Sequence, residues 1–248
     1  MSAAYKILIV APSWVGDMVM SQTLLKLLKL KHGTNCQIDV LVNSWALDVV
    51  KRMPEVNQVH VNPFGHGEFG LIKRIKLGFS LRSEHYDQCF VLPNSFKSAL
   101  VPFFAGIPKR TGFVGEMRYG LLNDSYKLDK LALPLMIERF CALANAGRKP
   151  DAIEFPSFSV DTQNQTKVLK RLDLNLLKPV VCLCPAAEYG PAKRWPTAHF
   201  AKLANLLQVQ NYQVWIMGSA KDQSIAEEIV QQASINADLH NLCGRTNL

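Results

Sequence analysis

The sequence lacks the patterns that mark a disulfide scaffold, a zinc site or a membrane protein. Its six cysteines include no C-x-x-C pair and no cluster with the spacing of zinc ligands. Most of them lie in apolar runs, which favours free core thiols in a reducing cytosol. No apolar run is long enough for a signal peptide or a membrane-spanning helix. We therefore expect a cytoplasmic protein that is at most peripheral at a membrane.

A glycine-rich nucleotide fingerprint is also missing. The first strand-like run, Lys6–Ala11, leads into Pro-Ser-Trp-Val-Gly-Asp, so Gly16 stands alone where G-x-G-x-x-G would be. This disfavours a dehydrogenase. Disorder is disfavoured as well, because hydrophobic residues make up 48% of the 248 residues and no segment is of low complexity.

Positive charge is concentrated in the first part of the chain. The formal net charge is +8, and residues 1–150 carry 19 basic and 11 acidic side chains, whereas residues 151–248 carry nine of each. The excess indicates a phosphorylated substrate, an anionic membrane surface or nucleic acid as a partner, or else it serves only solubility. Nucleic acid is disfavoured, because aromatic residues do not interleave with the basic ones on one face.

Short apolar runs alternate with helical patterns along this first part. The expected strands are Lys6–Ala11, Gln37–Val42, Val56–Val61 and Gln88–Leu92. The expected helices are Asp17–His32, Trp45–Met53, Phe69–His85, a helix from an Asn94 N-cap to Ala105, and Pro134–Ala146. Such alternation predicts an α/β fold with a parallel, doubly wound sheet of Rossmann-like type.

The pattern restarts after a loop-rich stretch, residues 106–131, and a proline-containing linker, residues 147–158. Helices are expected at 162–171, 197–208 and 222–233, and strands at 179–184 and 212–217, with the hint of another at 239–242. We therefore expect two domains, residues 1–150 and 151–248. The second shows fewer clear strands than a parallel sheet usually has, so the sequence looks cut inside this domain.

Asp17 lies directly after the first strand, at the start of a helix. In open α/β sheets, ligands bind at this carboxyl end of the strands. A partly desolvated carboxylate there could act as a general base, because burial raises its pKa. The alternative is an acidic residue that only stabilises the helix start through the helix dipole.

The second part repeats this arrangement after its own strands. Lys193 and Arg194 precede a helix N-terminus, where cations oppose the helix dipole, so they indicate a ligand such as a diphosphate. A solvated basic loop is the alternative. Gly218 and Ser219 follow the next strand, where small residues let a ligand approach the backbone, although an ordinary strand-to-helix turn explains them too.

Four further residues, Asn94, Lys97, Arg110 and Arg118, add polar and cationic groups to the first part. Together they could form a surface for an acidic acceptor. Taken singly, each of them indicates little.

Five longer runs carry a specific resemblance. They are residues 11–21 (APSWVGDMVMS), 92–108 (LPNSFKSALVPFFAGIP), 115–124 (GEMRYGLLND), 190–196 (GPAKRWP) and 218–222 (GSAKD). On these runs the chain resembles the ADP-heptose:lipopolysaccharide heptosyltransferases of glycosyltransferase family nine, most of all their type II branch, over its whole length.

The resemblance implies a GT-B glycosyltransferase, with two facing Rossmann-like domains and the site in the cleft. The first domain would bind the acceptor and the second the nucleotide sugar. It implies inverting transfer of heptose from ADP-heptose to the lipopolysaccharide inner core, with no obligatory metal or redox cofactor and no nucleic-acid partner. The family also carries a donor-binding Asp-Ser-Gly-x-x-His segment beyond the point where this chain ends.

The resemblance also assigns roles to single residues. Asp17 matches the base, and Lys193 matches the lysine that contacts the donor diphosphate. The other implied donor-binding residues are Ala187, Glu188, Gly218, Ser219 and Asp222. The implied acceptor-binding residues are Ser13, Trp14, Asn94, Lys97, Arg110 and Arg118. A sister enzyme has threonines at the positions of Ala187 and Glu188, and the match at Asp222 is ambiguous with Ala220 and Lys221.

Two alternatives remain beside this function. One is a sister heptosyltransferase that acts one step earlier, which product analysis with defined acceptors would distinguish. The other is a non-catalytic nucleotide-binding module, which would bind ADP but lose no transfer activity when Asp17 is changed.

Overall fold

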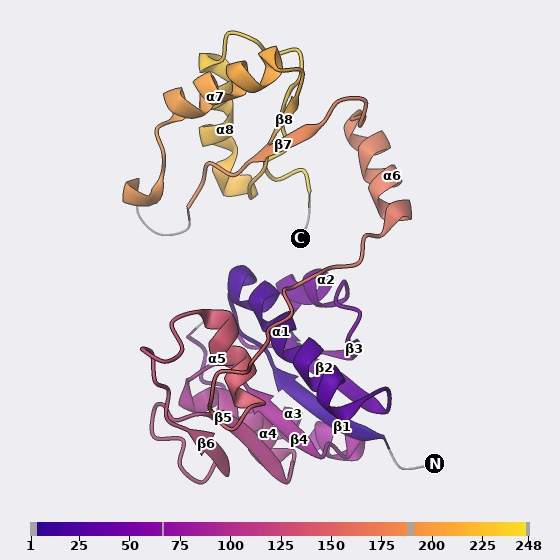
Figure 1. Cartoon of the computed structure of the whole chain (residues 1–248), viewed down its shortest axis with the longest axis vertical. Helices are drawn as coiled ribbons and strands as arrows, with labels where there is room; N and C mark the ends of the chain where they lie inside the picture. Colours follow the sequence, from indigo (N-terminus) through magenta and orange to yellow (C-terminus); the bar gives the residue numbers. More distant parts are fainter. Residues whose placement is uncertain (1–3, 66, 188–190, 247–248) are drawn as a thin grey trace. The chain divides into compact units, whose positions relative to one another are not determined.

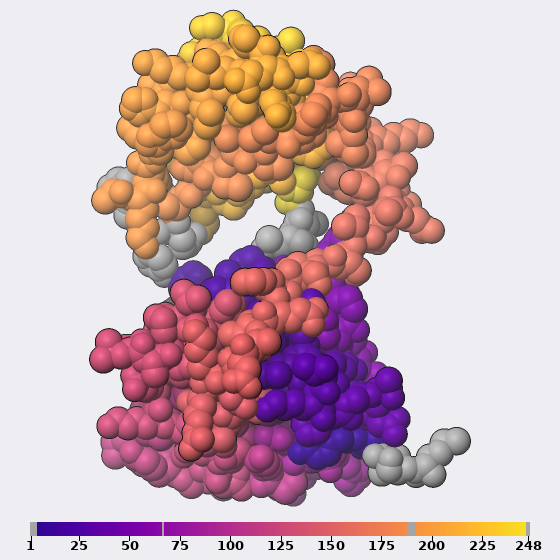
Figure 2. Space-filling view, in the orientation of Figure 1, coloured from indigo at the N-terminus to yellow at the C-terminus, as the bar shows by residue number. Residues whose placement is uncertain are grey.

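The computed structural model describes residues 4–65, 67–187 and 191–246, and the chain divides into two compact units, Met1–Val160 and Asp161–Leu248 (Figure 1). The boundary lies about ten residues later than the sequence predicts. The reason is that the linker belongs to the first unit, whose surface it crosses in Figure 2. The Ser157 amide donates to Gln22 Oε1 at 2.9 Å, and the Ser159 amide donates to the Arg52 carbonyl at 2.9 Å.

The first unit is built on a six-stranded sheet in which every pairing is parallel. Its strands are β1 (Tyr5–Val10), β2 (Cys36–Asn43), β3 (Val56–Asn62), β4 (Gln88–Val91), β5 (Lys109–Phe113) and β6 (Asp124–Tyr126). They are arranged in the order β3-β2-β1-β4-β5-β6, which is the strand order of Rossmann folds. The order reverses between β1 and β4, so the switch point at which such sheets bind ligands lies between these two strands.

Helices cover both faces of this sheet (Figure 1). On one face lie α1 (Val15–His32), α2 (Leu47–Val50) and α5 (Met136–Leu143), and on the other lie α3 (Leu71–Ser80) and α4 (Leu100–Phe104). Short 3-10 turns, η1 (Ser44–Ala46), η2 (Leu81–Glu84) and η3 (Phe96–Ala99), precede or follow them. The sequence therefore predicts the doubly wound arrangement correctly.

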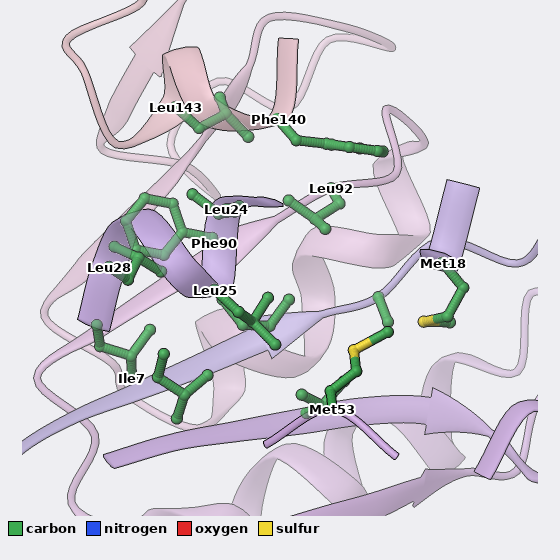
Figure 3. Close-up of a cluster of buried hydrophobic side chains, with 14 of the residues drawn as sticks. Ile7, Met18, Leu24, Leu25, Leu28, Met53, Phe90, Leu92, Phe140 and Leu143 are labelled. Carbon is green, nitrogen blue, oxygen red and sulfur yellow. The ribbon is translucent and has the colours of Figure 1, made fainter. Parts of the chain in front are cut away.

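Strand β1 shows why the sequence folds this way. Ile7 and Ile9 pack in the cluster beneath α1, whereas Leu8 and Val10 pack in the cluster beneath α3. Successive side chains point to opposite faces of a strand, and both faces of a parallel sheet are covered, so all four residues are buried. Figure 3 shows the first of these clusters, in which Phe90 of β4 lies among the leucines of α1.

The loop-rich stretch 106–131 proves to contain two strands, β5 and β6, so the expectation of loops there is wrong. Both strands are short and mostly polar, which conceals them from a search for apolar runs. Side-chain bonds compensate for the missing apolar contacts. The buried Thr111 hydroxyl accepts from Gln88 Nε2 at 2.7 Å and donates to Asp124 Oδ2 at 2.8 Å.

The second unit holds a three-stranded parallel sheet in the order β7-β8-β9. Its elements are α6 (Thr162–Leu172), β7 (Val180–Leu183), η4 (Pro191–Lys193), α7 (Thr197–Val209), β8 (Gln213–Ile216), η5 (Ala220–Asp222), α8 (Gln223–Gln232) and β9 (Leu239–Asn241). The α/β class with parallel sheets is thus confirmed in both units. The strand suggested at 239–242 forms as β9.

Side chains of the second unit pack mainly where α7 and α8 cover the sheet. Val214 and Ile216 of β8 are fully buried there. Cys182 and Cys184 are exposed, so the expectation of core thiols is wrong for these two cysteines. Alternation along β7 turns the Cys182 side chain away from the face on which Leu183 packs with the two helices, and Cys184 follows the end of the strand.

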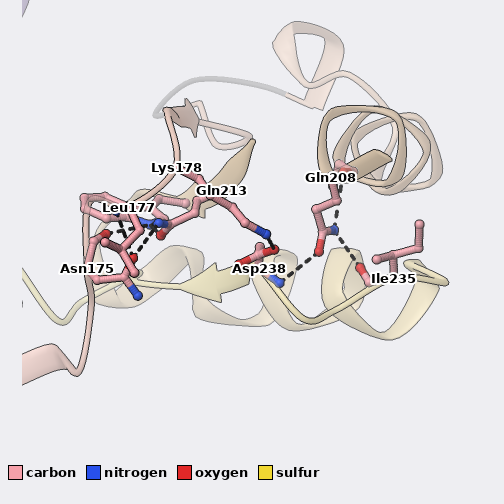
Figure 4. A network of polar contacts seen from close by, with 9 residues as sticks. Asn175, Leu177, Lys178, Gln208, Gln213, Ile235 and Asp238 are labelled. Atoms are coloured by element: carbon pink, nitrogen blue, oxygen red, sulfur yellow. Dashed lines mark hydrogen bonds and ion pairs between the residues drawn. The ribbon is translucent and has the colours of Figure 1, made fainter. Parts of the chain in front are cut away.

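A polar network joins the amino-terminal ends of the strands in this unit (Figure 4). Gln213 Nε2 donates to the Asn175 carbonyl and side chain at 3.1 and 3.0 Å, and Lys178 Nζ lies 2.6 Å from Asp238 Oδ2. Gln208 Nε2 donates to the Ile235 carbonyl at 2.7 Å. These bonds fix the starts of β8 and β9 and leave the carboxyl ends to the loops that carry candidate site residues.

Among the residues that the structure describes, no helix combines the length and the apolar character that crossing a bilayer requires.

Candidate active site

Asp17 lies at the switch point of the first unit. It sits in the first turn of α1, directly after the loop that leaves the carboxyl end of β1. The side chain is partly buried, and this burial raises the pKa of its carboxyl group above the ordinary value. No described residue donates a hydrogen bond to the carboxylate or pairs with it. A desolvated carboxylate without an internal partner has the properties that a general base needs.

Ser13 and Trp14 form the loop between β1 and α1. Both are exposed, and the Trp14 carbonyl accepts from the Met18 amide at 2.8 Å, which closes the first turn of the helix. The loop therefore presents a hydroxyl and an indole beside Asp17, at the edge where this sheet type binds ligands.

The loop after β4 comes to the same edge, because Val10 of β1 pairs with Val91 of β4. Asn94 is exposed in this loop, and Lys97 is partly buried, with Nζ donating to the Glu68 carbonyl at 3.3 Å. The structure thus brings Asn94 and Lys97 to the same edge as Asp17. Asn94 is not the N-cap that the sequence predicts, because Ser95 occupies the N-cap position of η3, without a capping bond from its side chain.

Arg118 is a support for this loop and is itself buried, with 2% of its surface exposed. Its guanidinium donates to the Pro93 carbonyl at 2.6 Å, to the Phe113 carbonyl at 2.5 Å and to Asn94 Oδ1 at 3.2 Å. Burial lowers the pKa of Arg118 to about 10, so the group stays charged at neutral pH. Arg118 therefore holds the Asn94 side chain, and its direct contact with an acceptor stays a prediction.

Arg110 lies apart from this group. It is the second residue of β5, and its guanidinium donates to the Leu121 and Ile107 carbonyls, each at 2.6 Å. These bonds tie the start of β5 to the neighbouring loops. Arg110 therefore lies at the amino-terminal end of β5 and not at the carboxyl edge, and its contact with an acceptor stays a prediction.

Glu116 is a residue of this edge that the sequence analysis missed. Its Oε2 accepts from the Phe96 amide at 2.7 Å, so it fixes the start of η3 two residues after Asn94. Glu116 and Met117 both have positive φ angles, of 42° and 54°. A Cβ atom on Gly115 would lie only 2.9 Å from the Asn94 carbonyl oxygen, so glycine is required there. The tight turn at 115–118 places Arg118 and Glu116 where both form hydrogen bonds with the loop after β4.

In the second unit, Lys193 and Arg194 lie in the loop between β7 and α7, and both are exposed. Arg194 donates to the Ala187 carbonyl at 3.4 Å, whereas no carboxylate among the described residues pairs with Lys193. An exposed ammonium group of this kind is available to an anionic ligand. Glu188, the other predicted residue of this loop, lies outside the described residues.

Gly218, Ser219 and Asp222 form the turn between β8 and α8. Asp222 Oδ2 accepts from the Ser219 amide at 2.8 Å and from its hydroxyl at 2.7 Å, so the carboxylate stabilises the helix start. A Cβ atom on Gly218 would lie 3.0 Å from both Cys243 Sγ and Asp222 Cβ, which explains the glycine by close packing. The Asp222 carboxylate is engaged within the chain, while Lys221 is exposed.

The two loops of the second unit leave the sheet at the same edge, because Leu183 at the end of β7 pairs with Ile216 at the end of β8. Ala187 and Lys193 follow the first strand, and Gly218, Ser219 and Asp222 follow the second. This edge offers a cation and a tight turn of small residues, which together suit a phosphorylated ligand.

Comparisons with known proteins bear on both units. Residues 74–248 match the family described as glycosyltransferase family 9 (heptosyltransferase). A curated relative from Escherichia coli strain K12, lipopolysaccharide heptosyltransferase 2, is 47% identical over 98% of this chain and 72% of its own length. The chain belongs to the heptosyltransferase family.

Two further relatives agree with this assignment. The lipooligosaccharide heptosyltransferase 2 of Haemophilus influenzae is 46% identical over 98% of this chain and 72% of its own length. The solved structure of Escherichia coli ADP-heptose lps heptosyltransferase II superposes with a TM-score of 0.87 at 45% identity, covering 98% of this chain and 73% of that one. The resemblance found in the five sequence runs is therefore confirmed, and this heptosyltransferase is a glycosyltransferase.

The described residues also bear on whether side chains could bind a metal ion together. Within residues 4–65, 67–187 and 191–246, no three histidine, cysteine, aspartate or glutamate side chains come together as ligands would.

Proposed function

We propose that this protein transfers L-glycero-D-manno-heptose from ADP-heptose to the heptosyl inner core of lipopolysaccharide, with inversion at the transferred sugar. The observation that supports this most directly is 47% identity, over nearly the whole chain, to a lipopolysaccharide heptosyltransferase 2. The solved Escherichia coli relative is an ADP-heptose lps heptosyltransferase, which supports the choice of donor.

Asp17 acts as the general base in this proposal. An acceptor hydroxyl attacks the anomeric carbon of the heptose from the side opposite to the diphosphate, and its proton passes to the Asp17 carboxylate. The new bond joins the acceptor oxygen to the anomeric carbon, while the bond from that carbon to the diphosphate oxygen breaks. ADP leaves with the bonding electrons, and the single displacement inverts the configuration. The raised pKa of Asp17 makes it a better proton acceptor than an ordinary aspartate.

Lys193 serves the leaving group. Negative charge grows on the diphosphate as the glycosidic bond breaks, and a nearby ammonium group stabilises this charge in the transition state. Its exposure and its lack of a carboxylate partner among the described residues support this role. Ala187, Gly218 and Ser219 line the same sheet edge and would let the diphosphate approach the backbone.

The acceptor side uses the loops after β1 and β4. Ser13, Trp14, Asn94 and Lys97 are placed around the switch point with Asp17, and Lys97 supplies a cation for a phosphorylated inner core. Arg118 contributes indirectly by holding the Asn94 side chain.

The protein should need only its donor and its acceptor. We expect no obligatory metal or redox cofactor, so transfer should persist in excess EDTA, and we expect no nucleic-acid partner. Because the acceptor carries a lipid, we place the protein at the cytoplasmic face of the inner membrane, with peripheral contact to it.

The test is a transfer assay with purified protein, ADP-heptose and two inner-core acceptors, one with a first heptose and one without. Mass spectrometry should show one added heptose only on the acceptor that already carries one. Addition only to the heptose-free acceptor would indicate the sister activity, and ADP binding without any transfer would indicate a nucleotide-binding module.

A further inference from the structure

An exposed surface that the catalytic proposal does not use lies on the α3–α4 side of the first unit. Ile72 is 69% exposed, Phe69 and Phe79 are each 49% exposed, and Phe103 is 40% exposed. Large apolar side chains gathered on one surface, rather than scattered singly, mark a site of interaction. We call these four residues, with the neighbouring cations Lys73, Lys76 and Arg82, the α3 patch.

Close packing of two helices makes this patch continuous. Gly78 faces α4, and a Cβ atom there would lie 2.6 Å from Phe104 Cβ and 2.8 Å from the Val101 carbonyl oxygen. With glycine at this position, Phe79 stacks on Phe104 at 6.4 Å, and Phe103 packs edge-on against the same ring at 5.3 Å. The exposed rings of α3 and α4 are thereby joined through Phe104 into one surface.

The opposite side of α3 faces the core of the unit and is occupied by other residues. Arg74 is buried, donates to the Phe69 carbonyl at 2.6 Å and lies 3.9 Å from the Phe64 ring centroid. Ile72 and Phe79 are seven residues apart and therefore share the outer face of the helix. Because the core side of the helix is occupied by other residues, the apolar side chains on the outer face do not belong to the core.

Cations lie beside the exposed rings of the α3 patch, an arrangement that the sequence pattern did not indicate. Arg82 lies 4.0 Å above the Phe79 ring, and Lys73 and Lys76 are exposed on α3. Lys73 also pairs with Glu68 at 3.0 Å. The sequence holds no acidic residue between positions 69 and 83. A basic helix with exposed apolar side chains has the composition of helices that lie in a membrane interface.

We propose that the α3 patch docks the protein on an anionic phospholipid surface, with Ile72, Phe79 and their neighbours entering the interface and Lys73, Lys76 and Arg82 meeting the headgroups. Charge complementarity identifies the occupant, since each cation near an anionic leaflet favours binding. A second copy of the chain fits poorly, because a self-complementary contact would bring the same cations together.

The position of the patch suits a lipid-linked acceptor, and in this respect the inference rests on the proposed function. Lys97, in the loop after β4, donates to the carbonyl of Glu68, which directly precedes the patch. The patch therefore borders the acceptor edge of the same unit, so docking would hold that edge near the sugars that emerge from the membrane.

The test is co-sedimentation with phosphatidylglycerol-containing vesicles and with phosphatidylcholine vesicles, without donor or acceptor. The wild type should bind the anionic vesicles far better, and added salt should weaken this binding. The double variant Lys73→Gln/Lys76→Gln should lose about fivefold in partition constant for each cation. Phe69→Ser/Ile72→Ser should lose roughly tenfold or more, because two exposed apolar side chains no longer enter the interface.

Matched controls lie elsewhere on the unit. Lys127→Gln/Lys130→Gln removes the same charge, and Leu131→Ser removes an apolar side chain that is 94% exposed. Both should bind vesicles like the wild type. Binding unchanged in the patch variants, equal losses in patch and control variants, or no preference for anionic vesicles would each overturn the proposal. Transfer to a delipidated acceptor is measured in parallel, and the patch variants should retain this activity. Loss of vesicle binding with transfer retained concerns the α3 patch alone, whereas loss of transfer in the wild type would concern the proposed function.

Discussion

Replacing Asp17 by asparagine removes the proposed base and almost nothing else. The side chain keeps its shape, and no described residue donates to the carboxylate, so no hydrogen bond within the described part of the protein is lost. Positioned proton transfer contributes roughly 10²–10⁴-fold to a rate, which corresponds to about 2.7–5.5 kcal/mol of activation free energy. We therefore expect Asp17→Asn to lower kcat by that factor.

The free energy of unfolding should not fall in Asp17→Asn, because the pKa of Asp17 is raised in the folded state. Burial raises the pKa of Asp17, so the folded state disfavours the ionised carboxylate that is present at neutral pH. The stabilisation that this raised pKa provides exists at acid pH and is lost as the pH rises through the folded-state pKa. An uncharged asparagine avoids this loss, so the free energy of unfolding at pH 7 should be unchanged or slightly higher than in the wild type.

The assay measures ADP release at saturating donor, thermal unfolding, and ADP binding by calorimetry, on the wild type and on Asp17→Asn. A large loss of kcat with unchanged melting temperature and ADP affinity is the expected result. The same raised pKa places the acid limb of the pH profile of kcat/KM above the range of an ordinary aspartate. Near-normal turnover in Asp17→Asn, or a fall in melting temperature that accounts for the lost activity, would refute the assignment of the base.

Substitutions at three positions test other parts of the structure. Lys193→Ala should weaken ADP binding by about 1.5–3 kcal/mol in calorimetry, the scale of a charge-assisted hydrogen bond. Lys193→Arg should restore little of this binding free energy. Unchanged ADP affinity in Lys193→Ala would contradict the diphosphate contact. Gly78→Ala should lower the free energy of unfolding by about 1–3 kcal/mol, because the new methyl group meets Phe104 and the α4 backbone. Urea titration measures this change, and a smaller effect would mean that the two helices can move apart freely. Arg118→Met should lower the free energy of unfolding by about 2–4 kcal/mol in the same titration, because it leaves buried carbonyl groups without donors. An unchanged free energy of unfolding would mean that Asn94 is held by other contacts.

The sequence predicts well where apolar pattern decides the structure. The apolar run at Lys6–Ala11 predicts a buried parallel strand, and the structure confirms it as β1, with Asp17 at the start of the following helix. The loops that carry Lys193 and Gly218 were likewise found because each follows an apolar strand.

The sequence fails where structure depends on partners that are distant along the chain. Strands β5 and β6 are polar, and their pairing with β4 and with each other holds them in the sheet. Arg110 and Arg118 look alike as basic residues, yet both are occupied by backbone carbonyl groups that only the folded chain brings within reach. The gripping role of Glu116 follows from a tight turn at positive φ, for which the run 115–124 gave no local signal other than Gly115.

Product analysis tests whether the protein transfers heptose to an inner core that already carries one. The protein, expressed from its own gene, is incubated with ADP-heptose and the monoheptosyl acceptor, and the product is examined by mass spectrometry and by NMR of the new anomeric centre. We expect one added heptose, inverted relative to the donor, in the wild type and almost none in Asp17→Asn. A product with retained configuration, or equal product from the two proteins, would contradict it.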